Sequence, residues 1–241
     1  MALAPVLAQV QALTFDVFGT VVDWRGSLIR EGEALGKAKG LRADWAAFAD
    51  AWRGLYQPQL SKVREGKLPW TKLDDLHRMS LDRLLKEFGI SGLDEAEIDR
   101  FNRAWHRLDP WPDAVQGLQR LHGKYPLATL SNGNVSLLMH MARRAGLPWD
   151  AILGAEPTRT YKPLPQAYRG TAELLSLEPG QCMLVAAHGS DLEAAARVGF
   201  RTAFVHRPLE FGPGKTPEAP PAGAFDIVAK DFLDLAGKLD C

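Results

Sequence analysis

Apolar positions in this chain follow two different spacings, which alternate along its second half. Short, mainly apolar runs, as expected of strands buried on both faces, occupy residues 12–16, 126–130, 182–187 and 202–205. Helical spacing of apolar residues predicts helices over 114–122, 135–144, 164–175, 192–198 and 232–239. A weaker strand is predicted over 151–153, a last strand over 225–228, and the Pro- and Gly-rich residues 208–223 predict a loop. This alternation predicts a parallel sheet covered by helices on both faces.

Residues 24–109 break the alternation, because they contain helical spacing without an apolar run of the strand type. Three predicted helix faces in this segment contain Trp45, Phe48, Trp52 and Tyr56, then Leu73, Leu76, Leu81, Leu84 and Leu85, and last Phe101, Trp105 and Leu108. Pro110 and Pro112 bracket the end of the segment. We therefore expect an α/β core built from residues 1–23 and 110–241, with residues 24–109 inserted as a helical cap after the first strand.

Composition and charge narrow the range of partners. The 241 residues are 46% hydrophobic and 24% charged, with 29 basic and 29 acidic side chains, which is an ordinary globular composition. A net charge of zero argues against a nucleic-acid partner, and no apolar run approaches the ~20 residues of a membrane span. The N-terminal stretch lacks the basic region of a signal peptide, and two cysteines are too few for a disulfide framework or a metal cluster. We therefore expect a cytoplasmic protein.

Polar side chains follow four successive predicted strands. They are, in chain order, Asp16, Ser131 with Asn132, Lys162, and Asp191. In an open parallel sheet, ligands bind beyond the carboxyl ends of the strands, so these groups are expected to meet in one crevice. Each has an ordinary interpretation on its own, as a turn residue, a helix cap or a solvated loop side chain. Their shared position favours a catalytic site.

The order of these residues, with Gly19-Thr20 after Asp16, resembles the haloacid dehalogenase superfamily over nearly the whole chain. The resemblance implies a Rossmann-like parallel-sheet core, a helical cap after the first strand and an aspartate nucleophile, here Asp16. Most members of this superfamily are phosphatases, so the reaction class depends on further positions.

Phe18 separates the two main reaction classes. A phosphatase of this superfamily carries a second aspartate at that position, which protonates the leaving alkoxide, whereas a halide is a weak base and needs no proton. The phosphatases also use Mg²⁺, and Ala187 stands where an acid would help to hold it. We therefore expect no metal and no cofactor. The chain resembles a type II (L-2-) haloacid dehalogenase, with Arg53 on the long cap helix and Lys162 before Pro163 as further matches.

The resemblance implies a hydrolysis in two steps. Asp16 displaces the halide from C2 with inversion, and water then cleaves the ester to release a D-2-hydroxy acid. Lys162 keeps Asp16 ionised, Asp191 holds Lys162 or activates water, and Arg53 receives the halide. The expected catalytic residues are Asp16, Arg53, Lys162 and Asp191. The expected substrate-binding residues are Phe18, Thr20, Ser131, Asn132, Tyr168 and His188.

His188 departs from this family, whose well-known members carry Ser-Ser-Asn where this chain has Ala186-Ala187-His188. An imidazole there can position the hydrolytic water, donate a hydrogen bond to the departing halide or serve only the fold. Fluoride is the halide that accepts hydrogen bonds most strongly. The halide-pocket interpretation therefore predicts that fluoroacetate is hydrolysed.

Other functions stay open at this point. The same nucleophile would serve metal-independent hydrolysis of another 2-substituted carboxylate, such as a small cyclic imino acid. A Mg²⁺-dependent phosphatase is a second alternative. A non-catalytic binding module is a third, although Asp16, Lys162 and Asp191 argue against it. The resemblance alone implies a homodimer, and the natural substrate and preferred halide stay open.

Overall fold

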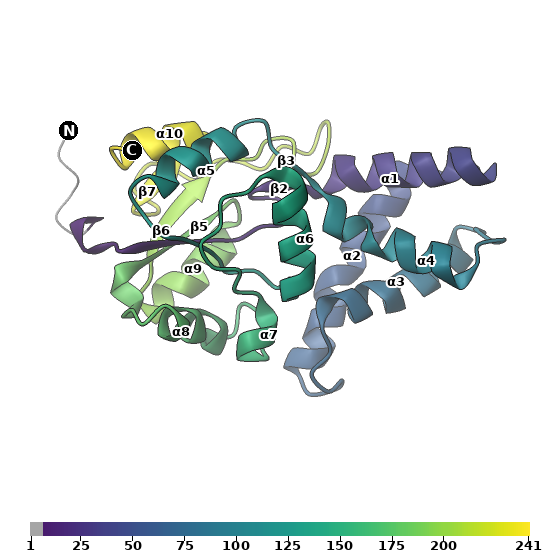
Figure 1. Ribbon diagram of the computed structural model, residues 1–241, viewed down its shortest axis with the longest axis horizontal. Helices are drawn as coiled ribbons and strands as arrows, with labels where there is room; N and C mark the ends of the chain where they lie inside the picture. The colour runs from purple at the N-terminus through teal and green to yellow at the C-terminus, as the bar shows by residue number, and fades with distance from the viewer. Residues whose placement is uncertain (1–6) are drawn as a thin grey trace.

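A computed structural model describes residues 7–241 of the chain; residues 1–6, on which the signal-peptide prediction partly rests, lie outside the described part. The central sheet has the strand order β4-β1-β5-β6-β7, with every neighbouring pair parallel. The strands are β1 (Ala12–Phe15), β4 (Leu127–Thr129), β5 (Cys182–Ala186), β6 (Arg201–Val205) and β7 (Ile227–Ala229). Figure 1 shows the sheet and its helices on one side of the molecule and a separate group of helices on the other. The predicted α/β class with a parallel sheet is confirmed.

Strand β1 lies inside the sheet, and all four of its residues are buried. Its residue Phe15 pairs with Thr129 of β4 and with Val185 of β5, so the three strands end at nearly the same level. The backbone N–H of Asp16 still donates to the carbonyl oxygen of Val185, at 3.0 Å. The register therefore brings the residues that follow these strands to one edge of the sheet.

Helices cover both faces of the sheet. Helices α5 (Ala114–His122) and α10 (Phe232–Lys238) pack together on one face, and α8 (Pro165–Leu174) and α9 (Gly189–Val198) pack together on the other (Figure 1). Helix α6 (Val135–Ala145) contacts the end of the cap. Between residues 7 and 241, no helix has the length and apolar character needed to cross a membrane.

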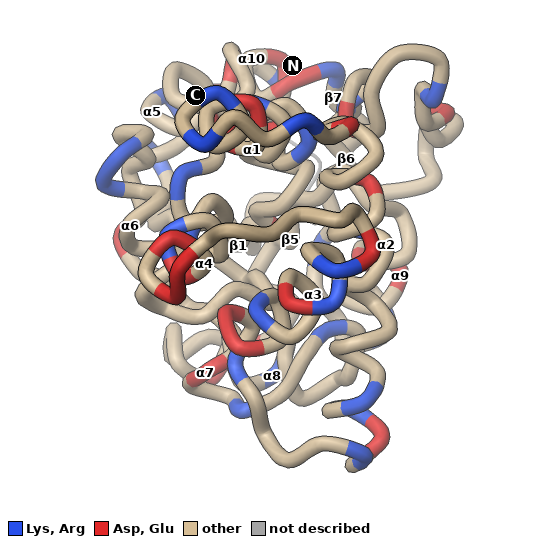
Figure 2. The backbone as a smooth tube through the Cα atoms, turned by 90° about the vertical axis from the view of Figure 1, so that its right-hand side faces the viewer, with Lys and Arg blue, Asp and Glu red and all other residues tan. Residues whose placement is uncertain are grey.

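The cap consists of α1 (Trp24–Lys39), α2 (Trp45–Arg64), α3 (Leu73–Glu87), α4 (Glu95–Asn102) and a 3-10 turn (Arg103–Arg107). Helices α2 and α4 begin at aspartates whose side chains accept backbone N–H groups of the first turn. Figure 2 shows basic and acidic residues interspersed along the cap helices, consistent with a chain whose charges balance.

The predicted aromatic face of α2 forms the centre of the cap. Trp52 is 1% exposed, and its ring centroid lies 5.8 Å from that of Phe48, 5.5 Å from Phe101 and 5.6 Å from Trp105. Tilted and edge-to-face arrangements of this kind are favourable, and burying each large apolar side chain contributes ~1.5–3 kcal/mol. Residues from separate predicted helices thus hold the cap together without a sheet.

A short antiparallel ribbon marks the place where the chain leaves the core and returns to it. It pairs β2 (Val22–Asp23) with β3 (Asp109–Pro110). The side chain of Asp23 accepts the backbone N–H of Gly26 and so starts the first cap helix directly at the ribbon. This arrangement supports the division of the chain at residues 24–109, which we retain as a proposal.

The weaker strand predicted over 151–153 is wrong. Ala151 makes only an isolated bridge to Ala128, and the short helix α7 (Ala155–Thr158) begins directly after Gly154. The segment between the turn at Asp150 and this helix is therefore too short to continue along the sheet edge. The Pro- and Gly-rich loop predicted over 208–223 contains neither a helix nor a strand.

Candidate active site

A cleft of about 530 Å³ lies at the carboxyl end of the sheet, beneath helix α2 of the cap. The core lines it with Asp16, Lys162, His188 and Asp191, among others, and the cap with Arg53, Tyr56, Gln57 and Arg64. Two hydrogen bonds join the cap to the core nearby. Arg64 donates to the carbonyl oxygen of Lys162 at 2.8 Å, and the Tyr161 hydroxyl donates to the backbone carbonyl oxygen of Thr71 at 2.6 Å. The cap thus covers the strand ends and limits the access of water.

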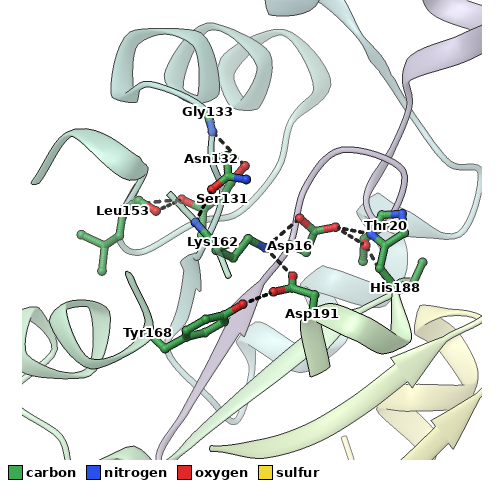
Figure 3. A network of polar contacts seen from close by, with 12 residues as sticks. Asp16, Thr20, Ser131, Asn132, Gly133, Leu153, Lys162, Tyr168, His188 and Asp191 are labelled. Carbon is green, nitrogen blue, oxygen red and sulfur yellow. Dashed lines mark hydrogen bonds and ion pairs between the residues drawn. The ribbon is translucent and has the colours of Figure 1, made fainter. Parts of the chain in front are cut away.

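Asp16 follows β1 and is 7% exposed. Its Oδ1 lies 3.0 Å from Nζ of Lys162, and its Oδ2 lies 2.7 Å from the hydroxyl of Thr20 and 3.1 Å from Nδ1 of His188 (Figure 3). Burial alone would raise the pKa of this carboxyl. Lys162, His188 and Thr20 outweigh burial and hold the pKa of Asp16 well below its usual range. Asp16 is therefore a carboxylate at neutral pH despite its burial.

Thr20 is oriented by the turn that follows β1. Gly19 has φ +84°, a conformation that favours glycine, and it directs the chain back toward Asp16. The Thr20 hydroxyl donates to Oδ2 of Asp16 and accepts the backbone N–H of Ala187, at 2.9 Å. With both bonds made, the hydroxyl fixes one oxygen of Asp16.

Lys162 lies between two carboxylates (Figure 3). Its Nζ contacts Oδ1 of Asp16 and also Oδ2 of Asp191, and only 8% of the lysine side chain is exposed. Burial alone would lower the pKa of Lys162, but the two carboxylates raise it above its usual value. The hydroxyl of Tyr168 donates to the other oxygen of Asp191, at 2.6 Å. Helix α9 begins at Gly189, three residues earlier than predicted, and so holds Asp191 in its first turn.

Asn132 lines the cleft and positions the backbone of the lysine, since its Oδ1 accepts the N–H of Lys162 at 2.8 Å. Its neighbour Ser131 is 4% exposed and accepts the N–H of Gly133 at 3.2 Å. Ser131 lines a separate small cavity of about 10 Å³ rather than the cleft.

Three of the expected substrate contacts are not among the residues that line the cleft. Thr20, Ser131 and Tyr168 lie outside the cleft lining, and Thr20 and Tyr168 are completely buried. Their hydroxyl groups are used to hold Asp16, a backbone turn and Asp191, respectively. Phe18, Asn132 and His188 do line the cleft.

Arg53 points from α2 into the cleft. Its guanidinium carbon lies 4.4 Å from the ring centroid of Tyr56 and 5.4 Å from that of Trp24, so two aromatic faces hold it in place. Its Nη1 is buried and has no hydrogen-bond partner among residues 7–241. A buried, unpaired N–H of a cation suits an incoming anion, such as a halide or a carboxylate.

Phe18 packs against the cap where a phosphatase would present an acid. Its ring centroid lies 6.4 Å from Tyr56 and 5.9 Å from Trp105, in edge-to-face geometry. Within the described part of the chain, no group of three or more His, Cys, Asp or Glu side chains is arranged to hold a metal ion. The residues present therefore do not fit the carboxylate-rich oxygen site that Mg²⁺ prefers.

His188 is bound on both sides by carboxylates. Besides the contact of Nδ1 with Asp16, its Nε2 lies 2.9 Å and 3.1 Å from the two oxygens of Glu210. Burial alone would lower the pKa of His188, but the two carboxylates raise it to about 10. Both ring nitrogens are thus occupied. The hydrogen bond to a departing halide that the sequence suggested is not available in this arrangement.

Sequence reasoning missed Glu210, which is 1% exposed and also accepts the indole N–H of Trp24 at 3.2 Å. It stands in the predicted loop, where no periodic spacing indicates which side chains are buried. The only local signal is its place between the apolar residues Leu209 and Phe211.

Comparison with known proteins agrees with this site. The sequence model of the haloacid dehalogenase-like hydrolases matches residues 10–199. This chain belongs to that family. Among solved structures, a defluorinating L-2-haloacid dehalogenase is 48% identical, with a TM-score of 0.93 and 96% of each chain covered. The expected resemblance to L-2-haloacid dehalogenases is confirmed.

Two further comparisons, one of sequence and one of structure, lead to Xanthobacter autotrophicus. Its (S)-2-haloacid dehalogenase is 28% identical over 207 residues, which cover 82% of this chain and 76% of the relative. The structure of an L-2-haloacid dehalogenase from this organism with chloropropionic acid covalently bound has a TM-score of 0.80 and 25% identity, covering 96% of this chain and 98% of that one. A covalent adduct in that relative fits a nucleophile of the Asp16 type.

Proposed function

We propose that this hydrolase converts short L-2-haloacids to D-2-hydroxy acids through an ester on Asp16, without a metal or cofactor. One observation carries the proposal. Asp16 is an ionised, buried carboxylate that lines the same cleft as Arg53, whose Nη1 has no hydrogen-bond partner within residues 7–241. A nucleophile and an anion acceptor are the two groups that displacement of a halide requires.

The first step forms the ester. A carboxylate oxygen of Asp16 attacks C2 from the side opposite the halogen, the carbon–halogen bond breaks, and the configuration at C2 inverts. The cap excludes the water that would otherwise solvate Asp16 and weaken it as a nucleophile. Arg53 stabilises the halide as its negative charge develops.

The second step regenerates the enzyme. Water adds to the carboxyl carbon of Asp16, and the bond between that carbon and the substrate oxygen breaks. Lys162 stays paired with Asp191 throughout, so a cation remains beside the reacting carboxyl after Asp16 has become a neutral ester. The product is the hydroxy acid with inverted configuration.

Charges in the cleft suit an anionic substrate. Arg64 and Arg197 line the same cleft as Arg53, and Lys162 lies at its floor beside Asp16. Because a 2-haloacid is a carboxylate at neutral pH, these cations favour its entry and orientation. This preference is consistent with a small-molecule acid as the partner.

Fluoroacetate is included in the proposed substrates. The support is the likeness to the L-2-haloacid dehalogenase described as defluorinating, which extends over 96% of both chains. We also propose that the protein is a homodimer, which sedimentation of the purified protein tests. We propose in addition that it is cytoplasmic, which fractionation of cells tests.

Release of halide ion tests the proposed function directly. We expect chloroacetate, L-2-chloropropionate and fluoroacetate each to release halide. For each of these substrates, the rate should be unchanged by EDTA. D-2-chloropropionate should release little halide. Activity lost with EDTA and restored by Mg²⁺ would overturn the metal-free mechanism. Phosphate release from phosphate monoesters, or no halide release from any haloacid, would overturn the dehalogenase assignment.

A further inference from the structure

The protonation of His188 follows from its neighbours. Its Nδ1 faces Asp16 at 3.1 Å, and its Nε2 faces Glu210 at 2.9 Å. An ionised carboxylate accepts hydrogen bonds and cannot donate them, so both ring nitrogens carry a proton. His188 is therefore an imidazolium ion whose Nδ1–H points at Asp16.

Glu210 is built into the core beneath this histidine. Its side chain is 1% exposed, and within residues 7–241 its salt-bridge partner is His188. Gly19 leaves room for it, since a Cβ at that glycine would lie 2.1 Å from Oε1 of Glu210. A buried carboxylate without a cationic partner is strongly unfavourable. Glu210 therefore keeps His188 protonated and oriented independently of Asp16.

The two oxygens of Asp16 have different neighbours. Oδ2 accepts from the Thr20 hydroxyl and from Nδ1 of His188, whereas Oδ1 accepts from Lys162 within the described residues. We infer that the less constrained Oδ1 attacks C2. Oδ2 then becomes the carbonyl oxygen of the ester, still facing Thr20 and His188.

We propose, resting on the dehalogenase function above, that Glu210 positions His188 so that its Nδ1–H and the Thr20 hydroxyl bind the oxyanion that forms on Oδ2 of Asp16 during ester hydrolysis. Water adds to Cγ of Asp16, and the electron pair of the carbonyl bond moves to Oδ2. When this pair returns, the bond between Cγ and Oδ1 breaks, and Oδ1 leaves in the hydroxy acid. One proton of the water ends on that hydroxyl, and the other is released as the Asp16 carboxylate is restored.

The order of events explains the need for a second carboxylate. Ester formation removes the negative charge of Asp16, which is one of the two anions that hold His188 protonated. Glu210 is unchanged by that step, so the imidazolium persists while charge develops on Oδ2. Donors placed in advance at a developing oxyanion stabilise the transition state more than the ground state.

Glu210→Gln tests the proposal, with Glu218→Gln, an exposed residue of the same loop, as the control. Each enzyme is mixed with excess chloroacetate and quenched at short times. Chloride and the mass of the quenched protein are then measured. For Glu210→Gln we expect a first-turnover burst of chloride within about twofold of the unmodified rate, then a steady rate at least ~10-fold lower with accumulation of the ester. Glu218→Gln should match the unmodified enzyme.

Other outcomes separate the inference from the proposed function. In Glu210→Gln, the chloride burst and the steady rate could fall together without accumulation of the ester, or the steady rate could stay unchanged. Either result would overturn the role of Glu210 while leaving dehalogenation established. No chloride from the unmodified enzyme would instead remove the proposed function itself.

A second variant keeps the test informative if Glu210→Gln does not fold. His188→Gln should accumulate the same ester, and its failure to do so would overturn the oxyanion role. Where both variants fold, adding Glu210→Gln to His188→Gln should not slow ester hydrolysis further, because Glu210 acts through His188. Additive losses would show that Glu210 acts on its own.

Discussion

The Nζ atom of Lys162 lies 3.0 Å from Oδ1 of Asp16, and these side chains are only 8% and 10% exposed. Burial disfavours both charges, yet the pKa of Asp16 is lowered and that of Lys162 is raised, because each ion stabilises the other. The ion pair therefore provides a carboxylate that is ionised but poorly hydrated, as a displacement reaction needs.

Replacing Lys162 with Met should lower halide release by ~100-fold or more, because Asp16 loses the cation that keeps it ionised. Because the pKa of Asp16 is lowered, its ion pair with Lys162 stabilises the folded protein fully at pH values above the usual carboxyl pKa. This stabilisation is lost as the pH falls through the lowered pKa of Asp16. Without Lys162, burial raises the pKa of Asp16, so the residual activity should decline at higher pH than in the unmodified enzyme. A pH profile of halide release measures both effects.

The exposed Lys86 on α3 provides the control for this change. Lys86→Met should leave the rate and the acid limb of the profile in place. An acid limb unchanged in Lys162→Met would show that Lys162 does not control the ionisation of Asp16.

Asp16→Asn should abolish turnover, because a neutral amide does not displace a halide. In the unmodified enzyme, one turnover in H₂¹⁸O should place the label in Asp16, since water adds to the carboxyl carbon and the hydroxy acid leaves with an original aspartate oxygen. Mass spectrometry of the peptide that contains Asp16 measures the label. Label in the hydroxy acid alone would mean that water attacks C2 directly.

Arg53→Ala should slow ester formation more than it weakens substrate binding, because the guanidinium matters most when the halide carries a full negative charge. We expect at least ~10-fold loss in kcat for chloroacetate, with a smaller change in KM. Arg103→Ala, an exposed arginine of the same cap, provides the control. Equal rates for Arg53→Ala and the unmodified enzyme would remove Arg53 from the halide site.

Comparison of fluoroacetate with chloroacetate separates two roles for His188. Both substrates form the same ester on Asp16, so an oxyanion donor acts after the halide has left. We expect His188→Asn to reduce chloroacetate turnover at least as much as fluoroacetate turnover, since cleavage of the strong carbon–fluorine bond limits the latter more. A larger loss with fluoroacetate would return His188 to the halide pocket that the sequence suggested.

Much of the fold could be predicted from the sequence because its signals are local. The strands around Phe15 and Val185 are mainly apolar runs, and the aromatic face of α2 has helical spacing. The strand predicted over 151–153 was wrong because three apolar residues do not show whether a neighbouring strand is within reach. The strand does not form because helix α7 begins directly after Gly154, and the apolar pattern does not indicate this helix.

Some contacts of the candidate site could likewise be predicted from the sequence, and others could not. Asp16 and Asp191 follow strands that the sheet contains, and parallel strands place their carboxyl ends at one edge, so their meeting could be expected from chain order. Lys162 was expected after the strand over 151–153, which does not form, so its position between the two carboxylates required the structure. The directions of Thr20, Ser131 and Tyr168 could not be expected either, since a hydroxyl turns toward whichever acceptor or donor the folded chain brings to it.

The α/β class, the family resemblance and the residue types at the strand ends follow from spacing and order along the chain, because these patterns are local. The contacts of Glu210 with His188 and Trp24 do not, because Glu210 stands in a loop without periodic spacing and meets both residues only in the folded chain. Contacts between residues far apart in the chain depend on how complete elements pack. The partner that keeps His188 protonated therefore became visible only when Gly19 and the loop of Glu210 were placed side by side.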